Sequence, residues 1–211
     1  MDATSPEPRS SSSPFVWILL VLVAGAVLSY VAIGTAPRGG DDATKHPAVG
    51  RRLQFLRLEG LTSGAAATSL DDLRGRVALV NYWGTWCGPC IIELPHLLKL
   101  ADTFAAEPDF RFLPVSCGGE ADADLDELRT ATEAFLSARN LTLATYADQH
   151  AASRRAMSIL LSLDNFAYPT TLVLDRRGTI RGFWIGYDPR AVDEMTALVR
   201  ELLAEPTDQG K

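Results

Sequence analysis

Two cysteines three positions apart, Cys87 and Cys90, offer the clearest chemistry in this sequence. They lie in the run NYWGTWCGPCIIELP, between an apolar segment and a segment with helical spacing. At a helix N-terminus, unpaired N–H groups and the helix dipole stabilise an anion. A thiol placed there ionises below its usual pKa of about 8.5 and becomes a nucleophile near neutral pH. We therefore predict that Cys87 attacks disulfides and that Cys90 resolves the mixed disulfide that forms.

Other interpretations of the cysteine pair are weaker. Zinc requires four ligands, and the pair supplies only two. The remaining candidate ligands have no ligand-pair spacing with one another; they are Cys117, His96 and His150. A purely structural disulfide is also disfavoured, because so short a loop does little to stabilise distant parts of the chain. We expect no metal site. For Cys117 we expect a small buried residue, the alternative being a third redox thiol.

The elements around the cysteines predict an α/β domain. The continuous apolar run Val77–Trp83 is typical of a strand buried on both faces, and a helix is predicted from Pro89 to Phe104. Further strands are predicted at Leu53–Leu58, Phe110–Ser116, Leu141–Asp148 and, as a hairpin, Thr170–Gly186, and further helices at Asp122–Asn140, Gln149–Leu161 and Asp188–Leu202. This alternation implies a mixed central sheet with helices on both faces.

Length and composition indicate one folded domain with additional N-terminal segments. The chain has 211 residues, a net charge of -6 and no long basic run, so nucleic acid is not expected as a partner. We predict a disordered tail (1–14), a transmembrane anchor (15–33), a linker (34–50), the main domain (51–205) and a C-terminal tail (206–211).

The predicted anchor is the uncharged segment Phe15–Ile33, which has the length of a membrane-spanning helix, about 20 residues. A cleaved signal peptide is the alternative, although its apolar region is usually shorter, about 7–15 residues. Basic residues lie mainly after the segment, at Arg38, Lys45, Arg51 and Arg52. This asymmetry favours a cytoplasmic domain, but the rule is weak for long translocated domains.

The residues around the cysteines also resemble a known family. VNYWGTWCGPC closely resembles the active-site segment of thioredoxin-fold proteins. CGPCIIELP, with Glu93 and Pro95 after the pair, resembles the membrane-anchored thiol-disulfide oxidoreductases of the TlpA/ResA type. Tyr168–Gly182 and the helix and strand within Asp122–Asp148 extend this similarity to about residues 49–203. The resemblance implies a thioredoxin fold with an inserted helix-strand element.

The same resemblance implies roles for individual residues. Pro169 would be a cis-proline, and Glu93 would tune the active-site cysteines, the alternative being a solvated helix residue. Substrate would bind around Trp86, Gly88, Pro89, Tyr168, Pro169 and Thr170. Asn81 stands where thioredoxin has a buried aspartate, so the proton of Cys90 needs another route, for which Glu93 with water is the candidate. Gly84 in place of alanine and the bulky Tyr168 depart from the usual pattern.

The expected activity is thiol-disulfide exchange without a cofactor. The resemblance implies an extracytoplasmic reductase for cysteine-containing proteins, apocytochrome c among them, which a membrane thiol donor re-reduces. The dipeptide between the cysteines, Gly88–Pro89, matches that of reducing thioredoxin. A peroxiredoxin-like peroxidase is an alternative, but its motif needs threonine and proline where this chain has Gly84 and Val80. A non-enzymatic binding module is the other alternative.

Overall fold

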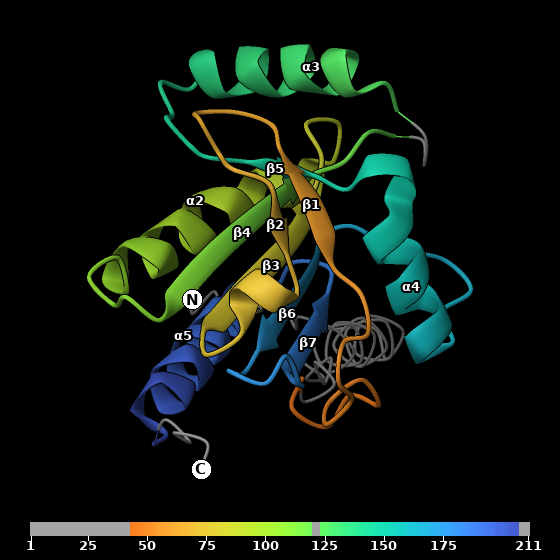
Figure 1. Cartoon of the computed structure of the whole chain (residues 1–211). Coiled ribbons are helices and arrows are strands. Elements are labelled where there is room, and N and C mark those ends of the chain that lie inside the picture. Colours follow the sequence, from red (N-terminus) through yellow and green to blue (C-terminus); the bar gives the residue numbers. More distant parts are fainter. Residues whose placement is uncertain (1–42, 120–122, 207–211) are drawn as a thin grey trace, which may run out of the picture. The chain divides into compact units, whose positions relative to one another are not determined.

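The fold follows from a computed structural model that describes residues 43–119 and 123–206 (Figure 1). The predicted tail and anchor, Phe15–Ile33 included, lie outside these ranges. Within them, no helix is both long enough and apolar enough to cross a membrane. The C-terminal tail is described only at its first residue.

A seven-stranded mixed sheet forms the centre of the domain, in the order β2-β1-β5-β4-β3-β6-β7. Strand β3, Val77–Trp83, is buried along its whole length, as its apolar sequence predicts. It pairs in parallel with β4 and antiparallel with β6. The other strands are β1 (Arg57–Gly60), β2 (Thr68–Ser69), β4 (Phe110–Ser116), β5 (Tyr146–Ala147), β6 (Thr170–Leu174) and β7 (Ile180–Ile185).

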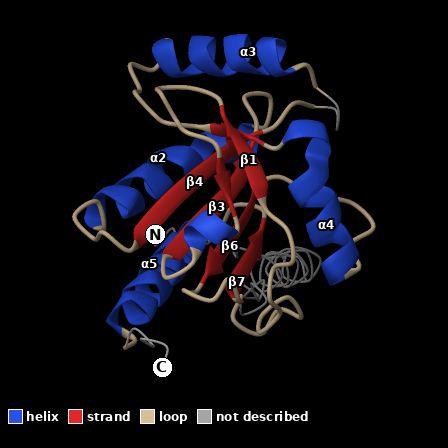
Figure 2. Cartoon of the chain, in the orientation of Figure 1, coloured by secondary structure: helices blue, strands red, loops and turns tan. Residues whose placement is uncertain are grey.

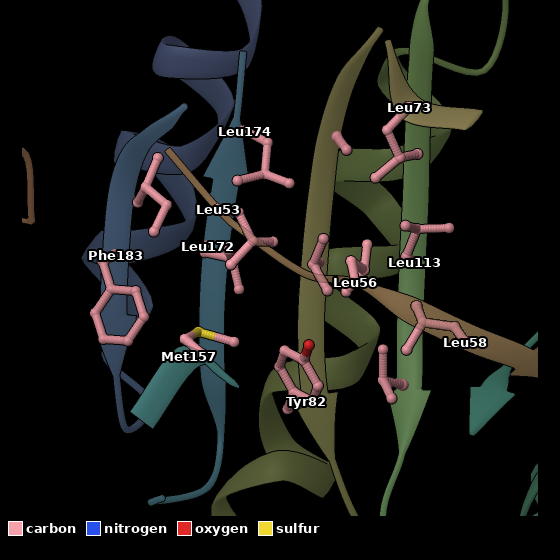
Figure 3. Close-up of a cluster of buried hydrophobic side chains, with 14 of the residues drawn as sticks. Leu53, Leu56, Leu58, Leu73, Tyr82, Leu113, Met157, Leu172, Leu174 and Phe183 are labelled. Carbon is pink, nitrogen blue, oxygen red and sulfur yellow. The ribbon is translucent and has the colours of Figure 1, made fainter. Parts of the chain in front are cut away.

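Helices cover both faces of this sheet (Figure 2). Alternate residues of a strand face opposite sides. Val77 and Leu79 pack with residues of α2 (Gly88–Thr103) and α5 (Pro189–Ala204). Ala78, Val80 and Tyr82 instead join the cluster that contains Met157 of α4 (Ala152–Leu161), and Figure 3 shows Tyr82 and Met157 together there. The predicted α/β arrangement is confirmed.

Side-chain caps begin two of the helices. Asp188 accepts a hydrogen bond from Arg190 N before α5, and Pro189 follows it in the first turn. Asp124 caps α3, Leu125–Ser137, in the same way. The helix predicted from residue 122 therefore starts a few residues later than expected.

The strand predicted over Leu141–Asp148 is wrong for most of its length. Only β5, Tyr146–Ala147, joins the sheet. Leu141 and Leu143 pack beside Phe135, and the backbone N–H of Leu61 donates to Thr145 O at 2.9 Å. The side chains of this segment are therefore packed, and its backbone is hydrogen-bonded, without regular strand pairing. Its apolar pattern alone does not distinguish this arrangement from a strand.

Two further boundaries differ from the predictions. The first strand covers residues 57–60 rather than Leu53–Leu58. Residue 52 makes an isolated bridge to Thr179, and Leu53 N donates to Gly178 O at 2.9 Å, in the turn between β6 and β7. The helix predicted from Gln149 begins instead with a 3₁₀ turn, Gln149–Ala151, in which His150 and Ala151 have φ values of 54° and 52°. Residues with a Cβ rarely adopt this left-handed conformation.

Candidate functional site

The two cysteines form a disulfide at the N-terminus of α2. Cys87 is the N-cap residue, and the backbone N–H of Cys90 donates to Cys87 Sγ at 3.3 Å. Cys87 is 5% exposed and Cys90 1% exposed. In the reduced protein, the same N–H group and the helix dipole would stabilise a thiolate on Cys87. Strand β3 and the short turn after it position the pair, as the sequence predicts.

The turn before the cysteines requires Gly84, which stands where the family usually has alanine. A Cβ on Gly84 would lie 2.5 Å from Nε1 of Trp86 and 2.9 Å from the carbonyl oxygen of Cys117. Trp86 Nε1 donates to that oxygen at 3.0 Å, while the side chain remains half exposed. Gly84 therefore lets the indole fold back over the end of β3.

The loop before β6 contacts Trp86 through Tyr168. The Tyr168–Pro169 peptide bond is cis, as the resemblance implied. Pro169 O accepts a hydrogen bond from Gly186 N at 2.8 Å, and Thr170 Oγ1 donates to Ala167 O at 2.8 Å. The rings of Trp86 and Tyr168 meet edge to face with centroids 5.2 Å apart. The structure thus brings the cysteine segment and the cis-proline loop together, and substrate binding by these residues stays a prediction.

Glu93 is a buried carboxyl group on α2, only 1% exposed. Asn81 Nδ2 donates to Glu93 Oε2 at 2.9 Å and to Thr171 Oγ1 at 2.8 Å. Burial raises the pKa of Glu93 to about 7, although the hydrogen bond from Asn81 acts in the opposite direction. The alternative of a solvated Glu93 is therefore wrong. Glu93 lies three residues after Cys90, on the same side of the helix.

Sequence reasoning missed what Asn81 does here. It noted only the lost aspartate, whereas the amide binds the carboxyl group of Glu93 and so joins β3 to α2. One signal was available: Asn81 has the same strand parity as Val77 and Leu79, which face α2. No sequence pattern indicated that Thr171 would accept a hydrogen bond from Asn81.

Cys117 is 2% exposed, and burial raises the pKa of its thiol to about 12. A thiol in this state is neutral at physiological pH and a poor nucleophile. This agrees with the prediction of a small buried residue. Among residues 43–119 and 123–206, no group of three or more histidine, cysteine and acidic side chains could hold a metal ion.

A buried ion pair lies behind the cis-proline loop, and sequence reasoning missed it as well. Asp148 Oδ2 and Arg154 Nε are 3.1 Å apart, with side chains 0% and 8% exposed. Arg154 also donates to the hydroxyl group of Tyr168. No motif marks this connection, because the residues come from separately predicted elements.

This mixed sheet, with a cysteine pair at the start of a helix and a cis-proline loop beside it, defines a thioredoxin-like protein. The chain belongs to the AhpC/TSA family, whose family model matches residues 50–183, more than half of the chain. The resemblance seen in the sequence is confirmed, since relatives of the chain include proteins named ResA and DsbE.

The curated relatives are named as thiol-disulfide proteins or as thioredoxin-like. The chain is 30% identical to the thioredoxin-like protein YneN of Bacillus subtilis over 125 residues, 59% of this chain and 65% of that protein. It is 27% identical to the thiol:disulfide interchange protein DsbE of Pseudomonas aeruginosa over 160 residues, 75% and 79% of the two chains. ResA of Geobacillus kaustophilus is 28% identical over 53% of this chain and 56% of that protein. The chain thus spans about half to two-thirds of the length of several relatives.

Solved structures share the fold. A putative protein disulfide isomerase from Bacteroides thetaiotaomicron superposes with a TM-score of 0.60 at 19% identity, covering 74% of this chain and 91% of that chain. A putative thiol:disulfide interchange protein DsbE from Chlorobium tepidum gives a TM-score of 0.58 at 19% identity, covering 74% and 98%. At this identity, the similarity concerns the fold alone.

Proposed function

We propose that the chain is a thiol-disulfide oxidoreductase that reduces disulfides of protein substrates. The observation that carries the proposal is the cysteine pair at the N-terminus of α2, with a backbone N–H directed at Cys87 Sγ. The Cys87 thiolate attacks one substrate sulfur, forms a mixed disulfide and expels the other substrate sulfur as a thiolate. Cys90 then attacks Cys87 Sγ and releases the second substrate thiol. Two electrons pass to the substrate, and the enzyme disulfide forms.

Glu93 is the proposed proton acceptor for Cys90 during the second step. A thiol must lose its proton before it attacks, and a base works best when its pKa is near the working pH. Burial places the pKa of Glu93 at about 7. Asn81 holds the carboxyl group in position. A water molecule would carry the proton between the thiol and the carboxylate.

We propose further that the domain works outside the cytoplasm, held by the segment Phe15–Ile33, and that a membrane thiol donor re-reduces it. The uncharged length of that segment supports a membrane anchor, and the Gly88–Pro89 dipeptide supports the reducing direction. The extracytoplasmic side rests on the similarity to ResA and DsbE, against the basic residues that follow the segment. Apocytochrome c is the proposed substrate among others. Alkaline phosphatase fused after Ser63 tests the side of the membrane: activity is expected, and an inactive, stably produced fusion contradicts the assignment.

Trapping tests the exchange reaction itself. The Cys90→Ser variant keeps the attacking thiol and lacks the resolving one, so we expect it to accumulate mixed disulfides with partner proteins. The Cys87→Ser variant is the matched control and should trap none. Equal trapping by both variants, or full biological activity of Cys87→Ser, would contradict exchange and favour a binding module.

The peroxidase alternative has its own measurement. Reduced chain is mixed either with hydrogen peroxide or with a protein disulfide, and its oxidation is followed in time. The proposal expects faster oxidation by the protein disulfide. Faster oxidation by peroxide would favour the peroxidase.

A further inference from the structure

A hollow of about 470 Å³ opens next to Tyr168, away from the cysteines. Its walls come from helix α4 and the loop that precedes Pro169, and they are mainly apolar. Ile159, Phe166 and Tyr168 supply the large apolar side chains. The other lining residues are Gly119, Ala151, Arg154, Arg155 and Ser158. The Ile159 side chain is 81% exposed. A single exposed isoleucine is ordinary, but one that borders an apolar hollow can contact a partner.

Tyr168 connects this hollow to the cysteine site. Its ring lies 5.2 Å from that of Trp86 on one side and 5.6 Å from that of Phe166 on the other, measured between centroids. The same side chain packs against the cluster that contains Cys87 and Cys90. A polypeptide bound at Cys87 can therefore extend over Tyr168 into the hollow without leaving the surface.

Tyr168, which lies between the hollow and the cysteine site, is held in place by buried charged side chains. Arg154 donates to the Tyr168 hydroxyl group and pairs with Asp148 at 3.1 Å. The carboxylate of Asp148 also accepts the backbone N–H groups of Ser153 at 2.8 Å and of Arg154 at 2.9 Å. Asp148, Arg154 and Tyr168 are thus joined by hydrogen bonds, so the Tyr168 ring is positioned before any ligand binds.

The backbone that leads into α4 is strained at the point where this arrangement begins. His150 and Ala151 both have left-handed φ values, 54° and 52°. Two successive residues with a Cβ adopt this conformation only when the surroundings require it, and such strain gathers at functional sites. Here it turns the chain so that Arg154, at the start of α4, reaches Tyr168.

We propose that this hollow binds a large apolar side chain of the substrate, close in sequence to the cysteine that Cys87 attacks. The occupant is an extended polypeptide segment, because Tyr168 lines the hollow and also contacts Trp86 and the cluster that contains both cysteines. The inference rests on the proposed function and adds a preference for substrate sequence. The redox step is unchanged: the enzyme dithiol is oxidised, and the substrate disulfide is reduced to two thiols.

A peptide series tests the preference. Each short peptide carries one cysteine as a mixed disulfide with glutathione, in a serine background, with one phenylalanine moved through about four positions on either side. Reduced full-length chain is mixed with each peptide, and the rate constant of a single turnover is measured. We expect one position to react about tenfold faster than the all-serine peptide, the size of effect that burial of an aromatic side chain supports.

Substitutions then test whether the residues that line the hollow cause that preference. Ile159→Asp places a charge on an exposed position of the hollow and should abolish the preference, while its rate with the all-serine peptide stays within about twofold of wild type. Phe166→Ser should do the same. Phe55→Ser removes another exposed aromatic side chain, which does not line the hollow, and should leave the preference intact.

Several outcomes overturn the proposal. One is a preference that survives Ile159→Asp, and another is an equal slowing of all peptides by that substitution. A wild-type chain that dimerises through this face, with dimerisation lost in Ile159→Asp, would assign the hollow to a second copy. A wild-type chain that reduces no peptide would instead contradict the proposed function, and the inference with it.

Discussion

Asn81 donates a hydrogen bond to Glu93 at 2.9 Å, from the central strand β3 to the helix that carries both cysteines. The acceptor is a carboxyl group with a pKa raised to about 7 by burial. An amide at residue 81 has no charge of its own, so it positions Glu93 without competing for the proton. The pair therefore provides one titrating group on the helix that carries the cysteines.

The pH dependence of the resolving step should report this group. In the wild-type chain, we expect resolution by Cys90 to accelerate as pH rises through about 7, because Glu93 then becomes a base. Glu93→Gln should lose this inflection and slow resolution by about tenfold to a hundredfold. Stopped-flow measurement of mixed-disulfide decay checks both. An unchanged profile in Glu93→Gln would remove Glu93 from the mechanism.

Asn81→Asp should move the same inflection upward. It places a second carboxyl group within hydrogen-bond distance of Glu93, and two adjacent carboxylates resist joint ionisation. We expect the inflection to rise above about 7 by about one pH unit or more. Asn81→Ser, which adds no charge, is the control. An inflection that stays in place, or falls, in Asn81→Asp would show that the two side chains do not interact.

Glu93 should also make stability depend on pH. Its pKa is higher in the folded chain, about 7, than its ordinary value of 4.5, so folding favours the protonated form. Stability is therefore expected to fall as pH rises between these values, by about 3 kcal/mol in total. Glu93→Gln should abolish this fall. Urea unfolding of the oxidised chain at about pH 5 and about pH 8 measures it, and a parallel decline in both proteins would contradict the assignment.

The sequence predicts the framework of this domain better than its contacts. Strand β3 is recognisable because its sequence is a continuous apolar run, and the helix start at Cys87 because Gly88 and Pro89 suit that position. The contact between Asn81 and Glu93 depends instead on how β3 and α2 pack. The hydrogen bonds that join Asp148, Arg154 and Tyr168 depend likewise on the direction in which α4 runs, which the left-handed turn at His150 and Ala151 sets. Such contacts leave no periodic pattern, so the sequence could not place them.

The buried ion pair should contribute far more to stability than an exposed one. Arg154→Met leaves the fully buried Asp148 carboxylate without its partner, and we expect a loss of about 3–5 kcal/mol. Arg74→Met is the control for an exposed pair, because Arg74 pairs with Asp71 at 2.8 Å with side chains 70% and 79% exposed, and it should lose about 1 kcal/mol or less. Urea unfolding compares them. Similar losses in the two variants would mean that Asp148 finds another partner.

Gly84→Ala should disturb the tryptophan beside the cysteines. The added Cβ would lie 2.5 Å from Trp86 Nε1, a separation that real side chains do not tolerate, so the indole must move and release Cys117 O. We expect a loss of about 1–3 kcal/mol together with a change in tryptophan fluorescence. Gly119→Ala is the control, because a Cβ there meets nothing within 4 Å and its φ is not positive. If both variants unfold at the wild-type urea concentration, the indole does not depend on Gly84, and alanine at this position would be neutral.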